Sequence, residues 1–95
     1  MRYRLLSGAT DDLLQALSYY EEIRLGLGLE FLDDFELAMR NVVEFPLAWT
    51  AIAKNHRRCL FSHFPYAVIY HEEDDLILVS ALMHLHKNPE DLDIQ

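Results

Sequence analysis

The sequence predicts an α+β fold of the order β-α-α-β-β-β, with an antiparallel sheet that carries a helical hairpin on one face. Between residues 13 and 45, apolar residues recur at steps of three and four, and glycines separate the two stretches. After residue 56 the apolar residues form short continuous runs bounded by turn residues, which is typical of strands. A chain of 95 residues is expected to form one domain over residues 1–95.

The first strand and the first helix are predicted at the N-terminus. Arginines alternate with Tyr3 and Leu5 in residues 1–6, as in a short strand. Thr10 is a suitable N-cap, and the two aspartates after it suit the positive end of a helix dipole. The helix that follows has an apolar stripe of Leu13, Ala16, Leu17, Tyr20 and Ile23.

A glycine turn and a second helix complete the predicted hairpin. The segment 26–28 ends the first helix, and Pro46 ends the second. Residues 46–55 are expected to be irregular. The second helix has a stripe of Phe31, Leu32, Phe35, Ala38, Met39, Val42 and Phe45.

Three strands are predicted in the second half, at residues 57–62, 66–71 and 76–84, with a hairpin turn at the acidic residues 72–75. The tail 89–95 is polar and expected to be flexible. The last two strands are apolar on both faces, whereas one helical hairpin covers only one face of a sheet. The second face is therefore expected to need a cover: the tail, a second copy, or another chain.

Charge and cysteine content restrict the function classes. A net charge of −8 argues against a general nucleic-acid binder. Residues 46–71 nevertheless hold three bases and no acid. A single cysteine, Cys59, excludes an internal disulfide and is consistent with a reducing cytoplasm. The N-terminus lacks the apolar segment of a signal peptide, and no apolar run is long enough to span a membrane.

An ordered set of short motifs runs along nearly the whole chain: Tyr19-Tyr20-Glu21, Leu27-Gly28-xx-Phe31, Phe45-Pro46, Arg58, Phe64-Pro65-Tyr66-xxx-Tyr70, His84 and Asn88-Pro89. This set resembles the RelE/ParE toxin superfamily, and most closely its ParE-like or plasmid stabilisation branch. The resemblance implies a bacterial, cytoplasmic toxin of a type II toxin–antitoxin system, neutralised by a cognate antitoxin. RelE-like members cleave messenger RNA on the ribosome without metal, whereas ParE-like members inhibit DNA gyrase.

The resemblance also implies candidate activity or target-contact residues. A metal-independent ribonuclease needs cations beside the scissile phosphate and groups that transfer protons. The candidates for these roles are Arg57, Arg58, His63, Tyr70, His84 and Lys87. Lys87 stands where the ribonucleases have an arginine, and it lacks the bidentate guanidinium. The tail adds three acids and no aromatic residue. These departures favour the ParE-like function, with the RelE-like endoribonuclease as the alternative.

Further alternatives concern structural roles. Neighbouring strand residues point to opposite faces, so Arg57 and Arg58 are expected to diverge, and at least one to pair with an acid of the helices. His84 and His86 share a strand face but lack a third zinc ligand, so neither metal nor cofactor is predicted. A third hypothesis is a non-toxic homo-oligomer, such as a homodimer, that buries the open sheet face against its own copy.

Overall fold

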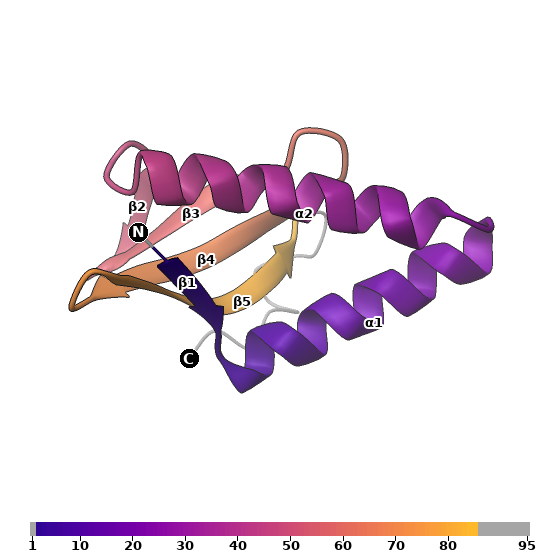
Figure 1. The fold of residues 1–95 in the computed structure, drawn as a ribbon, viewed down its shortest axis with the longest axis horizontal. Coiled ribbons are helices and arrows are strands. Elements are labelled where there is room, and N and C mark those ends of the chain that lie inside the picture. Colours follow the sequence, from indigo (N-terminus) through magenta and orange to yellow (C-terminus); the bar gives the residue numbers. More distant parts are fainter. Residues whose placement is uncertain (1, 86–95) are drawn as a thin grey trace.

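The structure is a computed structural model that describes residues 2–85. It contains β1 (Arg2–Leu5), α1 (Ser7–Ile23), α2 (Leu27–Glu44), β2 (Thr50–Ala53), β3 (His56–Leu60), β4 (Tyr66–Glu73) and β5 (Leu76–His84). The five strands form one sheet in the order β1-β5-β4-β3-β2, and both helices pack on the same face of it (Figure 1). The predicted α+β class and the helical hairpin on one face are confirmed. The predicted flexible tail, 89–95, lies outside the described residues.

The strand arrangement corrects the prediction at two places. The sheet is mixed, because β1 runs parallel to β5 while the other three pairings are antiparallel. A helical connection follows β1, so no tight turn forces it to run antiparallel to its neighbour. The segment expected to be irregular contains β2, whose four residues are all exposed. An exposed edge strand has no buried face, so it leaves no apolar pattern to detect.

Helix α1 begins earlier than Thr10. The Leu6 carbonyl accepts the Thr10 N–H at 3.0 Å, while the Leu6 N–H donates to the Val79 carbonyl at 2.9 Å. Strand β1 therefore passes directly into the helix, with Leu6 as the N-cap. Asp12 contacts the sheet: its Oδ2 accepts the Leu82 N–H at 3.0 Å, two residues beyond the bulge at Ser80. These contacts fix the start of α1 to β5.

The turn between the helices depends on its glycines. Gly26 has φ +91°, a conformation that L side chains rarely adopt. A Cβ on Gly28 would lie 2.9 Å from the Leu17 carbonyl oxygen, so only glycine permits this approach of α2 to α1. The Glu21 carboxylate accepts the N–H groups of Gly26 and Gly28 at 2.9 and 3.0 Å. These two backbone hydrogen bonds lower the pKa of Glu21.

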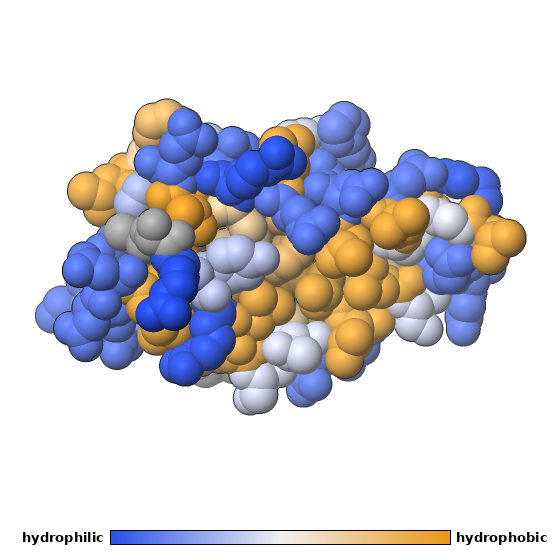
Figure 2. Space-filling view, in the orientation of Figure 1, coloured by the Kyte–Doolittle hydropathy of each residue, from blue (hydrophilic) through white to orange (hydrophobic). Residues whose placement is uncertain are grey.

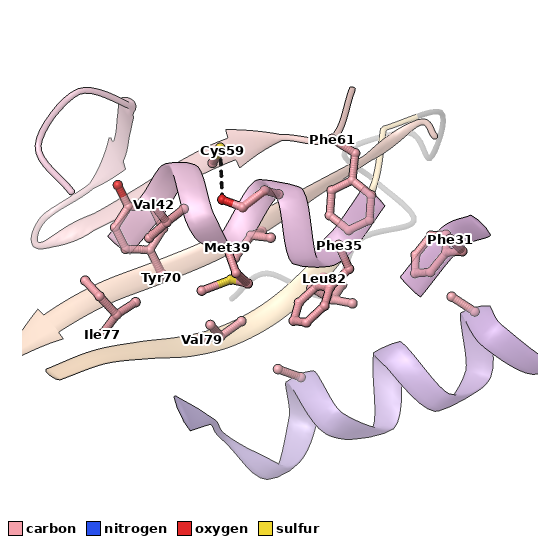
Figure 3. Close-up of a cluster of buried hydrophobic side chains, with 14 residues drawn as sticks. Phe31, Phe35, Met39, Val42, Cys59, Phe61, Tyr70, Ile77, Val79 and Leu82 are labelled. Carbon is pink, nitrogen blue, oxygen red and sulfur yellow. Dashed lines mark hydrogen bonds between the residues drawn. The ribbon is translucent and has the colours of Figure 1, made fainter. Parts of the chain in front are cut away.

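The core lies between the hairpin and the sheet. Side chains from α2 meet those from β3, β4 and β5 in one cluster (Figure 3). Phe31 is fully buried, and its ring centroid is 4.9 to 5.3 Å from those of Tyr66, Phe64, Phe61 and Tyr20. This aromatic group joins both helices to the ends of β3 and β4, so it fixes the hairpin on the sheet.

The other side of the sheet, here called the open face, carries no helix within residues 2–85. Registers place Ala81, Ile69 and Arg58 in one row across β5, β4 and β3, and Met83, Ala67 and Leu60 in the next. Leu60 is 51% exposed, and Ile69 and Met83 are half-buried. As the strand pattern predicts, the sheet is apolar on both faces while the hairpin covers one.

Candidate interaction site

Arg57 and Tyr70 face each other across β3 and β4 on the helix side, at the C-terminal end of α2. Tyr70 Oη donates to the Pro46 carbonyl at 2.6 Å, and Arg57 Nη1 donates to the Trp49 carbonyl at 2.7 Å. Both side chains thus hold the connection between α2 and β2. The expected pairing with an acid of the helices is wrong for Arg57, whose partner is the Trp49 carbonyl.

The chemistry of Tyr70 follows from its burial. The side chain is 1% exposed, and desolvation raises the pKa of the phenol to about 12, against a smaller opposing effect of Arg57. A phenol with this pKa is protonated at pH 7, and here its proton is donated to a carbonyl. The hydroxyl is therefore unsuited to act as a general base near pH 7. Beside it lies a pocket of about 340 Å³ whose lining includes Pro46, Leu47 and Arg57.

Arg58 lies on the open face, directly opposite Ile69 of β4. It is half-buried, and no acid among residues 2–85 pairs with it. The two arginines therefore point to opposite sides of the sheet, as the alternation of the strand predicts, because the pairing of β3 with β4 is free of bulges.

His63 lies in the turn between β3 and β4, where it contacts Asp34 of α2. The buried Asp34 carboxylate accepts the N–H groups of His63 and Phe64 at 2.8 and 2.9 Å, and its other oxygen lies 3.0 Å from His63 Nδ1. Burial raises the pKa of Asp34, but the hydrogen bonds from His63 and Phe64 together outweigh it, so the net shift is downward. Asp34 thus anchors the turn.

Sequence reasoning missed Asp34, although a signal was present. It stands three residues after Phe31 and four before Ala38, so it occupies the apolar stripe of α2. An acid in such a stripe is buried and needs hydrogen-bond donors. The sequence does not show which donors these are, because they come from a turn far along the chain.

His84 pairs with Tyr66 at the same end of the sheet as His63, and their ring centroids are 5.0 Å apart. Tyr66 and Tyr70 are four residues apart on β4, which corresponds to roughly 13 Å. Arg57 with Tyr70, His63 with His84, and Arg58 therefore occupy three separate places. Lys87 lies outside the described residues.

A histidine pair that was not among the candidates lies near the β2–β3 hairpin. The rings of His56 and His71 have centroids 4.7 Å apart, and His71 Nε2 lies 3.0 Å from Glu73 Oε2. The register of β3 and β4, continued by one residue beyond Arg57 and Tyr70, brings these two histidines together, and no spacing in the sequence indicates it. In the part of the chain that the structure describes, no three histidine, cysteine or acidic side chains gather to hold a metal.

Comparisons with known proteins identify relatives in sequence and in fold. No family model matches the chain. Toxin ParE2 of Mycobacterium tuberculosis, from strains CDC 1551 and H37Rv, is 28% identical over 89 residues, which cover 93% of this chain and 85% of the relative. A solved structure of the chromosomal ParDE TA system from P. aeruginosa matches with a TM-score of 0.72 at 12% identity, over 90% of this chain and 97% of the other. Among residues 2–85, neither helix has the length and apolar character needed to cross a membrane.

Proposed function

We propose that this chain, which is ParE-like in sequence and fold, is the toxin component of a type II toxin–antitoxin system. In this proposal it acts in the bacterial cytoplasm by binding a target such as DNA gyrase, and a cognate antitoxin neutralises it. The observation that carries the proposal is the 28% identity to Toxin ParE2 over most of both chains. The ParDE structure supports it through the fold.

The geometry favours binding over RNA cleavage. Tyr70 is buried and donates to Pro46, so its hydroxyl is not available to a ribose. The Arg57 guanidinium contacts the Trp49 carbonyl, and His63 contacts Asp34 at the opposite end of the strands. General acid–base catalysis requires such groups within hydrogen-bond reach of one bond, and their separation argues against a common site.

The exposed apolar surface is the second support. On the helix side, Figure 2 shows apolar surface over the hairpin, where Leu14, Ile23 and Leu29 are each exposed by 58 to 63%. On the open face, Leu60 is 51% exposed. Exposed apolar side chains on both faces suit a protein that works by contacting other proteins.

Induced expression in a bacterial host tests the proposal. Growth arrest is expected, and a supercoiling assay with purified chain and gyrase should show inhibition. The matched control is Phe31→Ala, which removes the central core ring and should abolish arrest by unfolding the chain. Growth that continues while folded wild-type chain accumulates would refute the toxin function. New cuts in host transcripts, seen by primer extension, would instead establish the endoribonuclease.

A further inference from the structure

We propose that the outer side of the helical hairpin docks on a basic surface of the protein that this chain targets. The inference rests on the proposed function, because a toxin that acts by binding needs a target. It adds which side of the molecule makes the contact and which charge the receiving surface carries. This docking area, here called the hairpin surface, consists of exposed and half-buried leucines with exposed acids around them: Leu14, Leu17, Leu25, Leu29 and Leu32 with Asp11, Asp33 and Glu36.

The hairpin surface presents leucines that the sheet does not cover. Leu25 in the turn is 87% exposed, Leu29 of α2 is 63% exposed and Leu14 of α1 is 58% exposed. Leu17 and Leu32 are half-buried, and they pack on the core from this side. Figure 2 shows the apolar surface over the hairpin that results. A partner can cover these side chains without displacing any part of the core.

Exposed acids lie beside these leucines. Asp33 and Glu36 follow Leu29 by four and seven residues, and Asp11 precedes Leu14 by three, so each acid lies on the same side of its helix as its leucine. All three acids are exposed. Within residues 2–85 none of them has an ion-pair partner. Their carboxylates are therefore available to cations of another protein.

The charge of the hairpin as a whole has the same sign. Residues 7–44 carry nine acids and two bases, a net charge of −7 out of −8 for the whole chain. One of the two bases, Arg24, is already paired with Glu30 at 2.9 Å. The field over the hairpin is thus negative, and it attracts a basic surface while it repels an acidic one.

Charge also argues against the other occupants of an apolar surface. A second copy docked hairpin to hairpin would bring two surfaces of charge −7 together. A nucleic acid or an anionic bilayer would be repelled in the same way. A basic protein surface remains, and an enzyme that binds DNA has one because it must neutralise phosphates. The inference therefore suits a target of this class.

A display library presented to the full-length chain tests the charge. Each member is a small folded scaffold whose variable face keeps three leucines and carries Lys, Gln or Glu with equal frequency at the surrounding positions. Selected binders should be enriched in Lys over Glu, and their affinity should fall as salt is added. Binders enriched in Glu, or without any preference, would overturn the proposal.

Variants then locate the binding on the chain. Leu29→Glu should weaken the affinity of the best basic binder roughly tenfold or more, and its control is Ile52→Glu at a 44% exposed position of β2. Glu36→Lys should weaken it roughly fivefold, whereas Glu72→Lys, an equal change of charge at an exposed position of β4, should leave it nearly unchanged. Circular dichroism confirms that each variant is folded. Equal effects of the hairpin and control variants, or a dimer that Leu29→Glu separates, would refute this site.

Growth arrest separates this inference from the toxin function. Leu29→Glu and Glu36→Lys should relieve the arrest while the chain stays folded, and the two control variants should arrest growth as the wild type does. Hairpin variants that remain fully toxic would refute the docking surface and leave the toxin function intact. A wild type that does not arrest growth would refute the toxin function, and the display experiment would still decide what the hairpin surface binds.

Discussion

Replacing Asp34 by alanine should destabilise the fold more than any other change of an acidic residue in α2. The carboxylate is 4% exposed and accepts two backbone N–H groups of the β3–β4 turn, with His63 Nδ1 at its second oxygen. Alanine leaves these donors without an acceptor in a half-buried place. The turn also carries Phe64, which packs on Phe31, so its release loosens the aromatic group.

The magnitude follows from the bonds that are lost. A hydrogen bond to a charged group contributes about 1.5–3 kcal/mol. The His63 side chain is largely exposed, so its contact contributes little. The two backbone N–H groups regain some hydrogen bonding to water once the carboxylate is gone. The expected loss in the free energy of unfolding is therefore about 3 kcal/mol in total. This corresponds to a fall of roughly 15 °C in the melting temperature for a domain of this size. Asp34→Asn keeps an acceptor and should lose only about 1 kcal/mol.

Urea unfolding followed by circular dichroism measures the difference. The control is the exposed neighbour Asp33, whose replacement by alanine should change stability by less than about 0.5 kcal/mol. Because the folded-state pKa of Asp34 is lowered, its carboxylate stabilises the fold at pH values above the unfolded-state pKa of about 3.9. This stabilisation disappears as the pH falls through the folded-state pKa. The wild type and Asp34→Ala should therefore converge in stability at acid pH. Equal effects of Asp33→Ala and Asp34→Ala at pH 7 would refute this reasoning.

Three further outcomes are expected. Gly28→Ala should cost roughly 1–3 kcal/mol, because its Cβ would lie 2.9 Å from the Leu17 carbonyl oxygen; calorimetry showing an unchanged melting temperature would contradict this contact. Tyr70→Phe should lower the free energy of unfolding by about 1 kcal/mol, because the hydrogen bond to Pro46 is lost, and it should still arrest growth. A variant that folds but no longer arrests growth would instead assign the hydroxyl to activity. Cys59 is buried, and desolvation raises its pKa to about 11, so Ellman's reagent at pH 8 should label it only after urea is added; rapid labelling of the native chain would show that the thiol is accessible.

The helices were predictable because their signal is local. Residues at steps of three and four lie on one face of a helix, so the stripes of α1 and α2 could be identified without any knowledge of the sheet. The start of α1 could not be predicted, because its N-cap Leu6 is held by a hydrogen bond to Val79 of β5. The direction of β1 could not be predicted for the same reason, since its strand partner among residues 2–85 is β5, which lies far along the sequence.

The candidate site was predictable only in part. Strand alternation correctly separates Arg57 from Arg58, because it is a local property of β3. The roles of Arg57 and His63 depend on Trp49 and Asp34, which come from other elements, and no spacing in the sequence connects them. The apolar character of the open face was predictable from the strand pattern, while the position of Arg2 and Arg4 beside Leu76 and Leu78 required the register of β1 on β5.

The pairing of β1 with β5 also governs how the molecule is made. Arg2 is made long before its register partner Leu76, so β1 stays without its strand partner β5 while the helical hairpin is made. Until then the helical hairpin has no completed sheet on which to bury its phenylalanines, and the nascent chain displays them. Such distant pairing slows folding and favours aggregation, so the chain should be inactive towards any target until β5 has been made.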